Sequence, residues 1–304
     1  MTSASRPGHR TARTSAQHRL RREVPCTAAV LADERDFRAM RRYRTFAFDD
    51  HRGYLRQMET LLRTLTAQGV LTTLSLFDPA AYETYCADLA LDPDRPESRT
   101  RYTAEAARTG ATVTYEGEPL SRLIPLLVEE AGRQAAWRHA SALLAGAGRC
   151  EECGADLAHA AFARATHALQ QLLTALGDGT QHLVCSLGVG APPLVAALHP
   201  TTRSDTPAPA AESESLIFCT VLAAGLAMGT PGGIVSRTTT DDSRRDTVRG
   251  WALWDSWLRP LTASEVFAAY CTDADTGEPI PPEHGVVHAP GLPLIPPPDL
   301  HGPH

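Results

Sequence analysis

HRGYLRQMETLLRTLTAQGVLTTLSLFDP, residues 51–79, places a helix pattern directly before a strand pattern. Up to Gly69 the apolar side chains recur every three or four residues, as on one face of a helix, and this glycine is suited to ending the helix. Residues 70–79 then form an apolar run of strand length that ends in an acid. Asp78 and Pro79 are typical of the first positions of a further helix. The stretch therefore predicts a helix, a strand and a second helix in succession, the pattern of an α/β unit.

The flanking segments extend this pattern. Three other apolar runs are short enough to be strands: CTAAVLAD at 26–33, YRTFAFDD at 43–50 and ATVTYEG at 111–117. Between and after them, apolar periodicity predicts helices at 78–91, 98–109 and 119–145. Strands that alternate with helices usually pair in parallel. We therefore predict an α/β domain at residues 23–147 with a mostly parallel sheet.

The second half of the chain follows a different order. Its apolar segments predict two strands, a helix, a strand hairpin and a final helix, at 182–200, 214–229, 233–255 and 262–271. This order predicts a smaller α+β domain of ββαββα type at residues 179–278. A turn and a connecting helix at 148–178 join it to the first domain. Residues 279–304 are rich in Pro and Gly and predict a tail that wraps the surface or stays loose. We expect the chain beyond about residue 285 to be removable without unfolding.

The amino-acid usage excludes several chemistries. The chain has no Lys and no Asn, so that all 29 basic residues are Arg, a bias that a very GC-rich genome explains. Without Lys there is no P-loop lysine, no Schiff base and no protein-kinase site, and without Asn there is no Cys-His-Asn triad. The motifs G-x-S-x-G, H-E-x-x-H and G-x-G-x-x-G are also absent. The sequence therefore leaves open whether the protein is an enzyme.

The charge of the chain constrains its partners. A net charge of -6 argues against general binding to nucleic acid. Residues 1–22 are the exception because they carry Arg and His but no acid, and we predict a disordered basic tail there, the one place suited to nucleic acid. No segment has the apolar length of a signal peptide or a membrane span, so we expect a cytoplasmic protein without a membrane partner.

Acidic residues follow the predicted strands of the first domain. The acids at or just after strand ends are Asp33, Asp49, Asp50, Asp78 and Glu116. Ligands gather at the carboxyl ends of parallel strands, and several carboxylates there could hold Mg²⁺ or Mn²⁺ for hydrolysis of phosphoesters or nucleotides. Asp49, Asp50 and Asp78 would then be the catalytic acids, with His51 as a general acid or base. The alternative is that these three acids only cap the helices that follow.

Arginines near the same edge could bind an anion. Arg52 follows the acidic pair, and Arg95, Arg99 and Arg101 lie at the predicted start of a helix. Unpaired backbone N–H groups at a helix start favour negative charge, and guanidinium groups bind phosphate or carboxylate with two hydrogen bonds. The four arginines therefore predict contact with a small anionic ligand. The alternative is that they are ordinary solvated side chains.

The segment GRCEECGADLAH, residues 148–159, contains a CxxC pair. Cys150 and Cys153 could supply two thiolate ligands to a structural zinc ion and His159 a third, while the fourth would come from elsewhere in the chain. A redox role fits less well, because Glu151 and Glu152 would raise the pKa of both thiols. The alternative that needs no ligand is a plain turn between two helices.

Tryptophans repeat near the end of the chain, at positions 251, 254 and 257. Spaced by three, they cannot all share one face of a strand, so at least one is expected to be exposed or to lie at an interface. Together with the missing enzyme motifs, this favours a ligand- or partner-binding regulatory protein. Its partner would be a small anion, another protein or a second copy of the chain. The alternative is the metal-dependent hydrolase described above.

Overall fold

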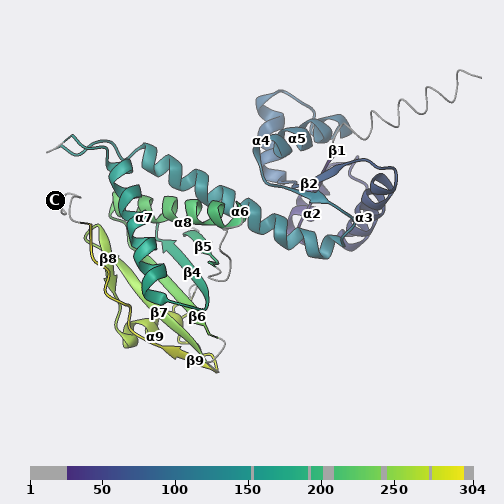
Figure 1. Ribbon diagram of the computed structural model, residues 1–304. Helices are drawn as coiled ribbons and strands as arrows, with labels where there is room; N and C mark the ends of the chain where they lie inside the picture. The colour runs from purple at the N-terminus through teal and green to yellow at the C-terminus, as the bar shows by residue number, and fades with distance from the viewer. Residues whose placement is uncertain are drawn as a thin grey trace, which may run out of the picture. The chain divides into compact units, whose positions relative to one another are not determined.

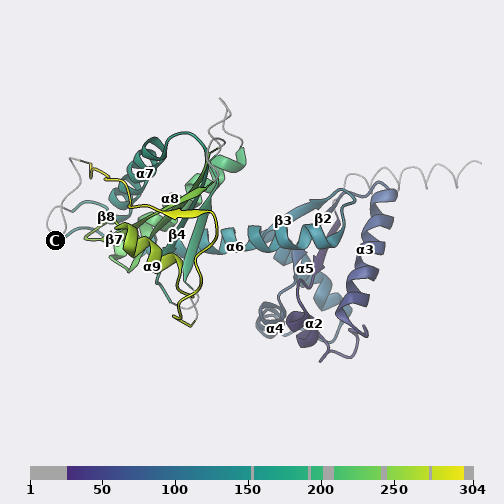
Figure 2. The same cartoon turned by 90° about the horizontal axis from the view of Figure 1, so that it is seen from below.

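The computed structural model describes residues 26–151, 154–190, 193–200, 209–240, 245–273 and 276–297. The chain is a mixed α/β protein that divides into two compact units, an N-terminal unit that ends at Gln134 and a C-terminal unit that begins at Ala135. Each unit has a hydrophobic core of its own and a sheet with helices packed beside it (Figures 1 and 2). No described helix is both long enough and apolar enough to cross a membrane.

The sheet of the N-terminal unit is mixed, in contrast to the mostly parallel sheet that we predicted. Its strands are β1 (Cys26–Val30), β2 (Thr72–Leu76) and β3 (Thr112–Tyr115), in this spatial order. β1 and β2 are parallel, whereas β2 and β3 are antiparallel. Two successive helices separate β2 from β3, and a pair of helices returns the chain to the end at which β2 stopped. β3 therefore runs back beside β2, which a single crossover helix would not allow.

Five helices accompany this sheet: α2 (Glu34–Met40), α3 (His51–Ala67), α4 (Pro79–Asp88), α5 (Pro96–Thr109) and the first part of α6 (Leu120–Ala145). α6 contributes Leu120, Leu123 and Leu127 to the core of the N-terminal unit and, further along, Ala136 and Ala140 to the other core. Pro79 and Pro96 each occupy the first position of a helix, where the missing N–H costs no hydrogen bond.

Residues 43–50 form a loop, so our prediction of a strand there was wrong. The rings of Phe46 and Phe48 lie 4.8 Å apart, and Phe48 meets Tyr54 of α3 at 5.1 Å. The apolar side chains of this run are thus covered by aromatic rings of a helix and not by neighbouring strands. An apolar run of this length cannot distinguish the two environments by its pattern alone.

The C-terminal unit contains the predicted strands and helices and two further strands. Its strands are β4 (Thr180–Leu187), β5 (Leu194–Leu198), β6 (Gly232–Thr239), β7 (Asp246–Trp254), β8 (Trp257–Pro260) and β9 (Val286–His288). The first five form an antiparallel sheet in the order β5-β4-β6-β7-β8, and β9 pairs with β7 in parallel. The helices are α7 (Leu157–Leu176), α8 (Pro209–Met228) and α9 (Ala263–Tyr270).

Small residues let the helices approach this sheet closely. Ala161, Ala165 and Ala168 of α7 are buried in the core beside α8. A Cβ atom at Gly225 of α8 would lie 2.5 Å from the Cδ2 atom of Leu187 on β4. α9 begins with a capping box, in which Thr262 and Glu265 bond each other's backbone N–H groups.

Residues 286–297, which we name the strap, are docked on the C-terminal unit. Trp251 Nε1 donates to the carbonyl oxygen of Leu292 at 2.8 Å, and Trp257 Nε1 donates to that of Leu294 at 3.2 Å. Leu294 is buried, with 8% of its surface exposed. These contacts argue against our expectation that the chain beyond about residue 285 can be removed without unfolding, which stays a prediction until a truncated chain is measured. The predicted basic tail, residues 1–22, lies outside the described residues.

Candidate functional site

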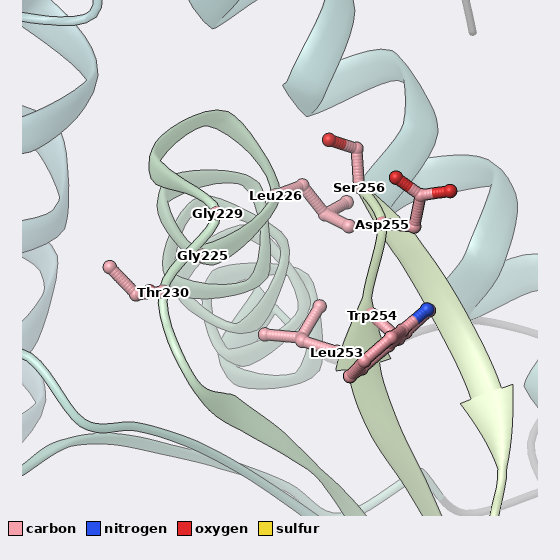
Figure 3. Close-up of a pocket in the computed structure, with 8 residues that line it drawn as sticks. All are labelled: Gly225, Leu226, Gly229, Thr230, Leu253, Trp254, Asp255 and Ser256. Atoms are coloured by element: carbon pink, nitrogen blue, oxygen red, sulfur yellow. The ribbon is translucent and has the colours of Figure 1, made fainter. Parts of the chain in front are cut away.

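A small hollow of about 30 Å³ lies between the end of α8 and the hairpin of β7 and β8 (Figure 3). Its lining consists of Gly225, Leu226, Gly229, Thr230, Leu253, Trp254, Asp255 and Ser256. Trp254 is the most prominent of them, because 70% of its surface is exposed. The spacing of the tryptophans predicted that at least one would be exposed, and Trp254 is that residue. Trp251, by contrast, is buried with 1% exposed.

The hairpin tip beside the hollow has an unusual backbone. Asp255 and Ser256 have φ angles of 52° and 56°, as in a type I′ turn, although neither is a glycine. Such a conformation costs a residue with a side chain of order 1 kcal/mol, and residues of this kind are frequent at binding sites. Trp257, which pairs with Trp254 across the hairpin, is held by its bond to Leu294 of the strap. The β8 side of the tip is thus held by the strap.

The glycines of the hollow are the part that sequence reasoning missed. Gly225 lies inside the apolar pattern of α8, and Gly229, with φ of 58°, follows the end of that helix. A glycine within an apolar helix indicates that another part of the chain approaches the helix closely. This signal was present in the sequence, but it does not show which element approaches.

The predicted catalytic acids of the N-terminal unit are mostly helix caps. Asp50 accepts the N–H of Gly53 at 2.7 Å and caps α3, and Asp78 accepts the N–H of Ala80 at 2.8 Å and caps α4. The capping alternative is confirmed for these two residues. Asp49 is exposed and makes no hydrogen bond or ion pair with a described residue. Each capping oxygen already bonds a backbone N–H, which a metal ion would have to replace.

The acids near the ends of β1 and β2 still influence one another. Burial and the nearby charges of Asp33 and Asp78 raise the pKa of Asp36, against the opposing effect of Arg35. In the part of the chain that the structure describes, no group of three or more His, Cys, Asp or Glu side chains is placed to hold a metal ion. The Mg²⁺ or Mn²⁺ site for phosphoester hydrolysis stays a prediction without a described geometry.

His51 is tied to the end of β1. Its Nε2 atom lies 3.0 Å from the carbonyl oxygen of Leu31, and its Nδ1 atom lies 3.8 Å from Glu34. Tyr54, one turn further along α3, accepts the N–H of Leu31 at 3.3 Å, and burial raises its pKa to about 12. The rings of His51 and Tyr54 are stacked, with 6.2 Å between their centroids. These contacts hold α3 against β1, which is a structural role.

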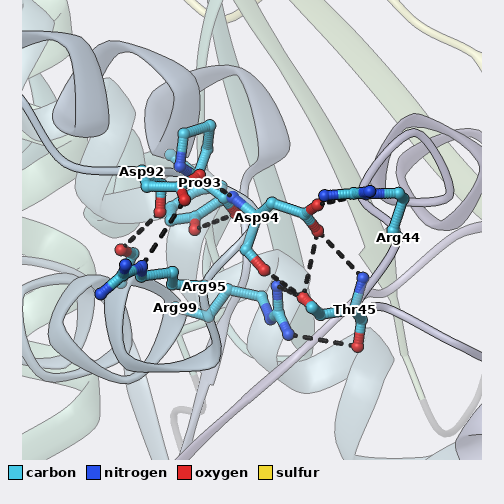
Figure 4. Close-up of polar contacts among 9 residues, drawn as sticks. Arg44, Thr45, Asp92, Pro93, Asp94, Arg95 and Arg99 are labelled. Atoms are coloured by element: carbon cyan, nitrogen blue, oxygen red, sulfur yellow. Dashed lines mark hydrogen bonds and ion pairs between the residues drawn. The ribbon is translucent and has the colours of Figure 1, made fainter.

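Two of the four predicted anion-binding arginines have partners within the protein (Figure 4). Arg99 donates to the hydroxyl oxygen of Thr45 at 3.0 Å, and Arg95 pairs with Asp92 at 3.6 Å. Their guanidinium groups are therefore engaged in holding the connection before α5 and the loop at 43–50. Arg52 and Arg101 are exposed and make no hydrogen bond or ion pair with a described residue.

Asp94 is the centre of the same network in Figure 4. It accepts the backbone N–H of Thr45 at 2.9 Å and pairs with Arg44 at 3.1 Å. The bond from Thr45, assisted by the charge of Arg44, lowers the pKa of Asp94. The network closes the loop at 43–50 onto the segment between α4 and α5, which explains why that loop is ordered without being a strand.

The CxxC turn is described only in part, since Cys153 lies outside the described residues. Cys150 donates its N–H to the carbonyl oxygen of Ala155 at 2.9 Å and accepts that of Gly154 at 2.9 Å. His159 is exposed, and its backbone N–H is capped by Asp156 at 3.0 Å. The turn between α6 and α7 is therefore closed by backbone bonds. A zinc ion on Cys150, Cys153 and His159 stays a prediction.

The comparisons with known proteins concern the N-terminal unit. Residues 15–118 match the model of a domain of unknown function, DUF8829. The match ends just after β3 and covers less than half of the chain. No curated protein and no solved structure matches the chain. The DUF8829 match thus includes the capping acids, His51 and the Asp94 network, whereas the hollow beside Trp254 lies outside it.

The cap at Asp78 gives a test of the metal prediction. Asp78→Ala is expected to lower the free energy of unfolding by about 1 kcal/mol, because two backbone N–H groups of α4 lose their acceptor. Asp49→Ala, which removes no bond to a described residue, is the matched control and should leave stability unchanged. Thermal unfolding of the parent and of both variants is recorded by circular dichroism with and without millimolar Mn²⁺. We expect Mn²⁺ to leave all three melting temperatures unchanged. A rise with Mn²⁺ that Asp78→Ala abolishes would instead support the hydrolase.

Proposed function

We propose that the protein is a partner-binding protein and that the hollow beside Trp254 receives a side chain of another protein. The observation that carries this proposal is the exposure of Trp254 at the edge of a concave surface. Exposed apolar surface next to a hollow is typical of a site for association.

The energetics of association favour this position. A tryptophan buries on the order of 200 Å² when it is covered, and tryptophans are among the residues that contribute most to protein interfaces. Because the hairpin tip is held on its β8 side, little conformational entropy is lost when Trp254 is covered. Trp254 is therefore placed as an anchor that requires no rearrangement of the protein.

The chemistry around the hollow indicates what kind of group it receives. Gly225 and Gly229 present backbone without side chains, and Leu226 and Leu253 form an apolar floor. Asp255 and Ser256 give the hollow a polar rim (Figure 3). An apolar side chain with a hydrogen-bond donor beside it fits these surroundings. With a volume of about 30 Å³, the hollow is too small for a cofactor and admits only the end of a side chain.

The test compares two exposed tryptophans. Tagged full-length protein, purified from its native cells after crosslinking, is expected to carry a partner in stoichiometric amount. Trp254→Ala should lose that partner, whereas Trp137→Ala, which removes a tryptophan with 44% of its surface exposed on α6, should retain it. Both variants should melt within a few degrees of the parent, because surface substitutions usually change stability by about 0.5 kcal/mol or less. A Trp254→Ala protein that still carries the partner would contradict the proposal.

A further inference from the structure

The strap lies on the C-terminal unit in the manner of a bound peptide (Figures 1 and 2, yellow). It begins as a strand, since β9 pairs in parallel with Asp246–Val248 of β7. Beyond β9, side chains of the unit bond its backbone carbonyl groups. Arg249 donates to Pro290 at 2.6 Å, Trp251 to Leu292 at 2.8 Å and Trp257 to Leu294 at 3.2 Å. Alternate carbonyl groups are bonded, as an extended chain requires.

The last bonds of the strap are made by α7. Gln171 Nε2 donates to the carbonyl oxygen of Ile295 at 2.6 Å, and Gln171 Oε1 accepts the N–H of Ile295 at 2.8 Å. This side-chain amide therefore imitates a neighbouring strand. We name the side chains of Gln171, Arg249, Trp251 and Trp257 the strap site.

The sequence of the strap suits this mode of recognition. Residues 289–297 read APGLPLIPP, in which the prolines favour an extended chain and cannot donate backbone hydrogen bonds. The carbonyl groups remain available as acceptors, and side chains of Trp, Arg and Gln are suitable donors. Proteins that bind Pro-rich segments use aromatic side chains in the same way.

Three positions of the strap determine its fit. A Cβ atom at Gly291 would overlap the carbonyl oxygen of Gly250, so that only glycine can lie there without displacing backbone. Leu294 enters the core of the unit, and Ile295 must carry a backbone N–H for Gln171. The strap site therefore requires a peptide with Gly at one position, an apolar residue three positions later and a residue other than Pro directly after it.

We propose that the strap site is a binding site for extended, proline-containing peptide segments of this pattern, and that the strap is the occupant from the same chain. Beyond β9 the rest of the C-terminal unit recognises the strap through backbone carbonyl and N–H groups, the close fit at Gly291 and one buried leucine, none of which requires a covalent link. A segment of the same pattern in another polypeptide binds when the strap is released. The strap site and the hollow beside Trp254 have different lining residues, although the bond from Trp257 to the strap also holds the hairpin tip next to the hollow.

The test frees the strap without removing it. A protease site is inserted between His284 and Gly285 of the full-length chain, and the folded protein is cleaved. A fluorescent peptide of residues 285–297 is then added in excess. It is expected to bind saturably, measured by anisotropy, and to release the native fragment in equal amount. Peptides with Leu294→Asp or Ile295→Pro should bind at least tenfold more weakly, whereas the Ile295→Val peptide should bind as the parent does.

A second measurement tests the proposal if the cleaved protein does not stay folded. The full-length Leu294→Asp chain carries a strap that fits poorly and should melt at a lower temperature than the parent. The parent peptide is expected to raise that melting temperature, and the Leu294→Asp peptide is not. Absence of exchange by a folded cleaved protein overturns the proposal, as does absence of stabilisation of the Leu294→Asp chain by the parent peptide.

Discussion

Ending the chain at Gly285 is expected to lower the free energy of unfolding of the C-terminal unit by on the order of 5 kcal/mol. The truncation exposes the site of Leu294, and burial of a leucine contributes about 2 kcal/mol. It also removes the acceptors of Arg249, Trp251 and Trp257, each such bond contributing about 1 kcal/mol. A loss of this size is comparable to the whole stability of many domains. We therefore expect a melting temperature lower by at least 10 °C.

All four tryptophans of the chain belong to the C-terminal unit, which makes tryptophan fluorescence a direct measure of its unfolding. A chain that ends at Pro297 keeps every described strap contact and is the matched control, so its urea midpoint should equal that of the parent. Equal midpoints for the two truncations would show that the strap contributes nothing to stability. That result would also remove the basis of the strap site.

The elements that the sequence predicted well are those with strong local signals. α3 and α4 begin after Asp50 and Asp78, whose side chains make the expected capping bonds. α9 lies within the helix predicted at 262–271, and Thr262 caps it. Capping requires only residues within one helical turn, so it can be recognised from a short stretch of sequence.

The direction of the strands could not be predicted in the same way. The reversal of β3 depends on how α4 and α5 pack against each other, and the strand pattern itself is the same for either direction. The loop at 43–50 depends on Thr45 meeting Asp94, two residues that lie far apart in the sequence. Such contacts are decided by the folded structure and leave no periodic signal.

The same contrast between local signals and long-range contacts applies to the candidate sites. An aspartate at a strand end is equally suited to capping a helix and to binding a metal, so the pattern alone could not separate the two. The sequence predicted a tail that wraps the surface or stays loose, and it could not decide between the two because the strap is bound through carbonyl groups of a proline-rich segment, whose side-chain pattern shows no period. Trp251 and Trp257 gave the only signal, since a buried indole needs an acceptor for its N–H.

The second large effect is expected from Gly233→Ala in β6. A Cβ atom at this position would overlap the carbonyl oxygen of Trp251, a backbone atom of the neighbouring strand β7. Backbone within a hydrogen-bonded sheet cannot move aside as the end of a side chain can, so the methyl group must separate β6 from β7. These strands lie inside the sheet order and not at its edge. We expect destabilisation by about 4 kcal/mol or more, or no folded C-terminal unit.

Gly225→Ala is the control that identifies the cause. Its Cβ atom would also come close to neighbouring atoms, 2.5 Å from Leu187 Cδ2 and 2.8 Å from Leu253 Cδ1, but both are the ends of flexible side chains. Alanine is also favoured over glycine within a helix by about 1 kcal/mol, which offsets part of the repacking. We expect a net change within about 1 kcal/mol, measured by urea unfolding followed by tryptophan fluorescence. Equal losses of unfolding free energy for the two variants would mean that the backbone of β7 moves aside as easily as a leucine side chain. The close pairing of β6 and β7 would then not limit the stability of the sheet.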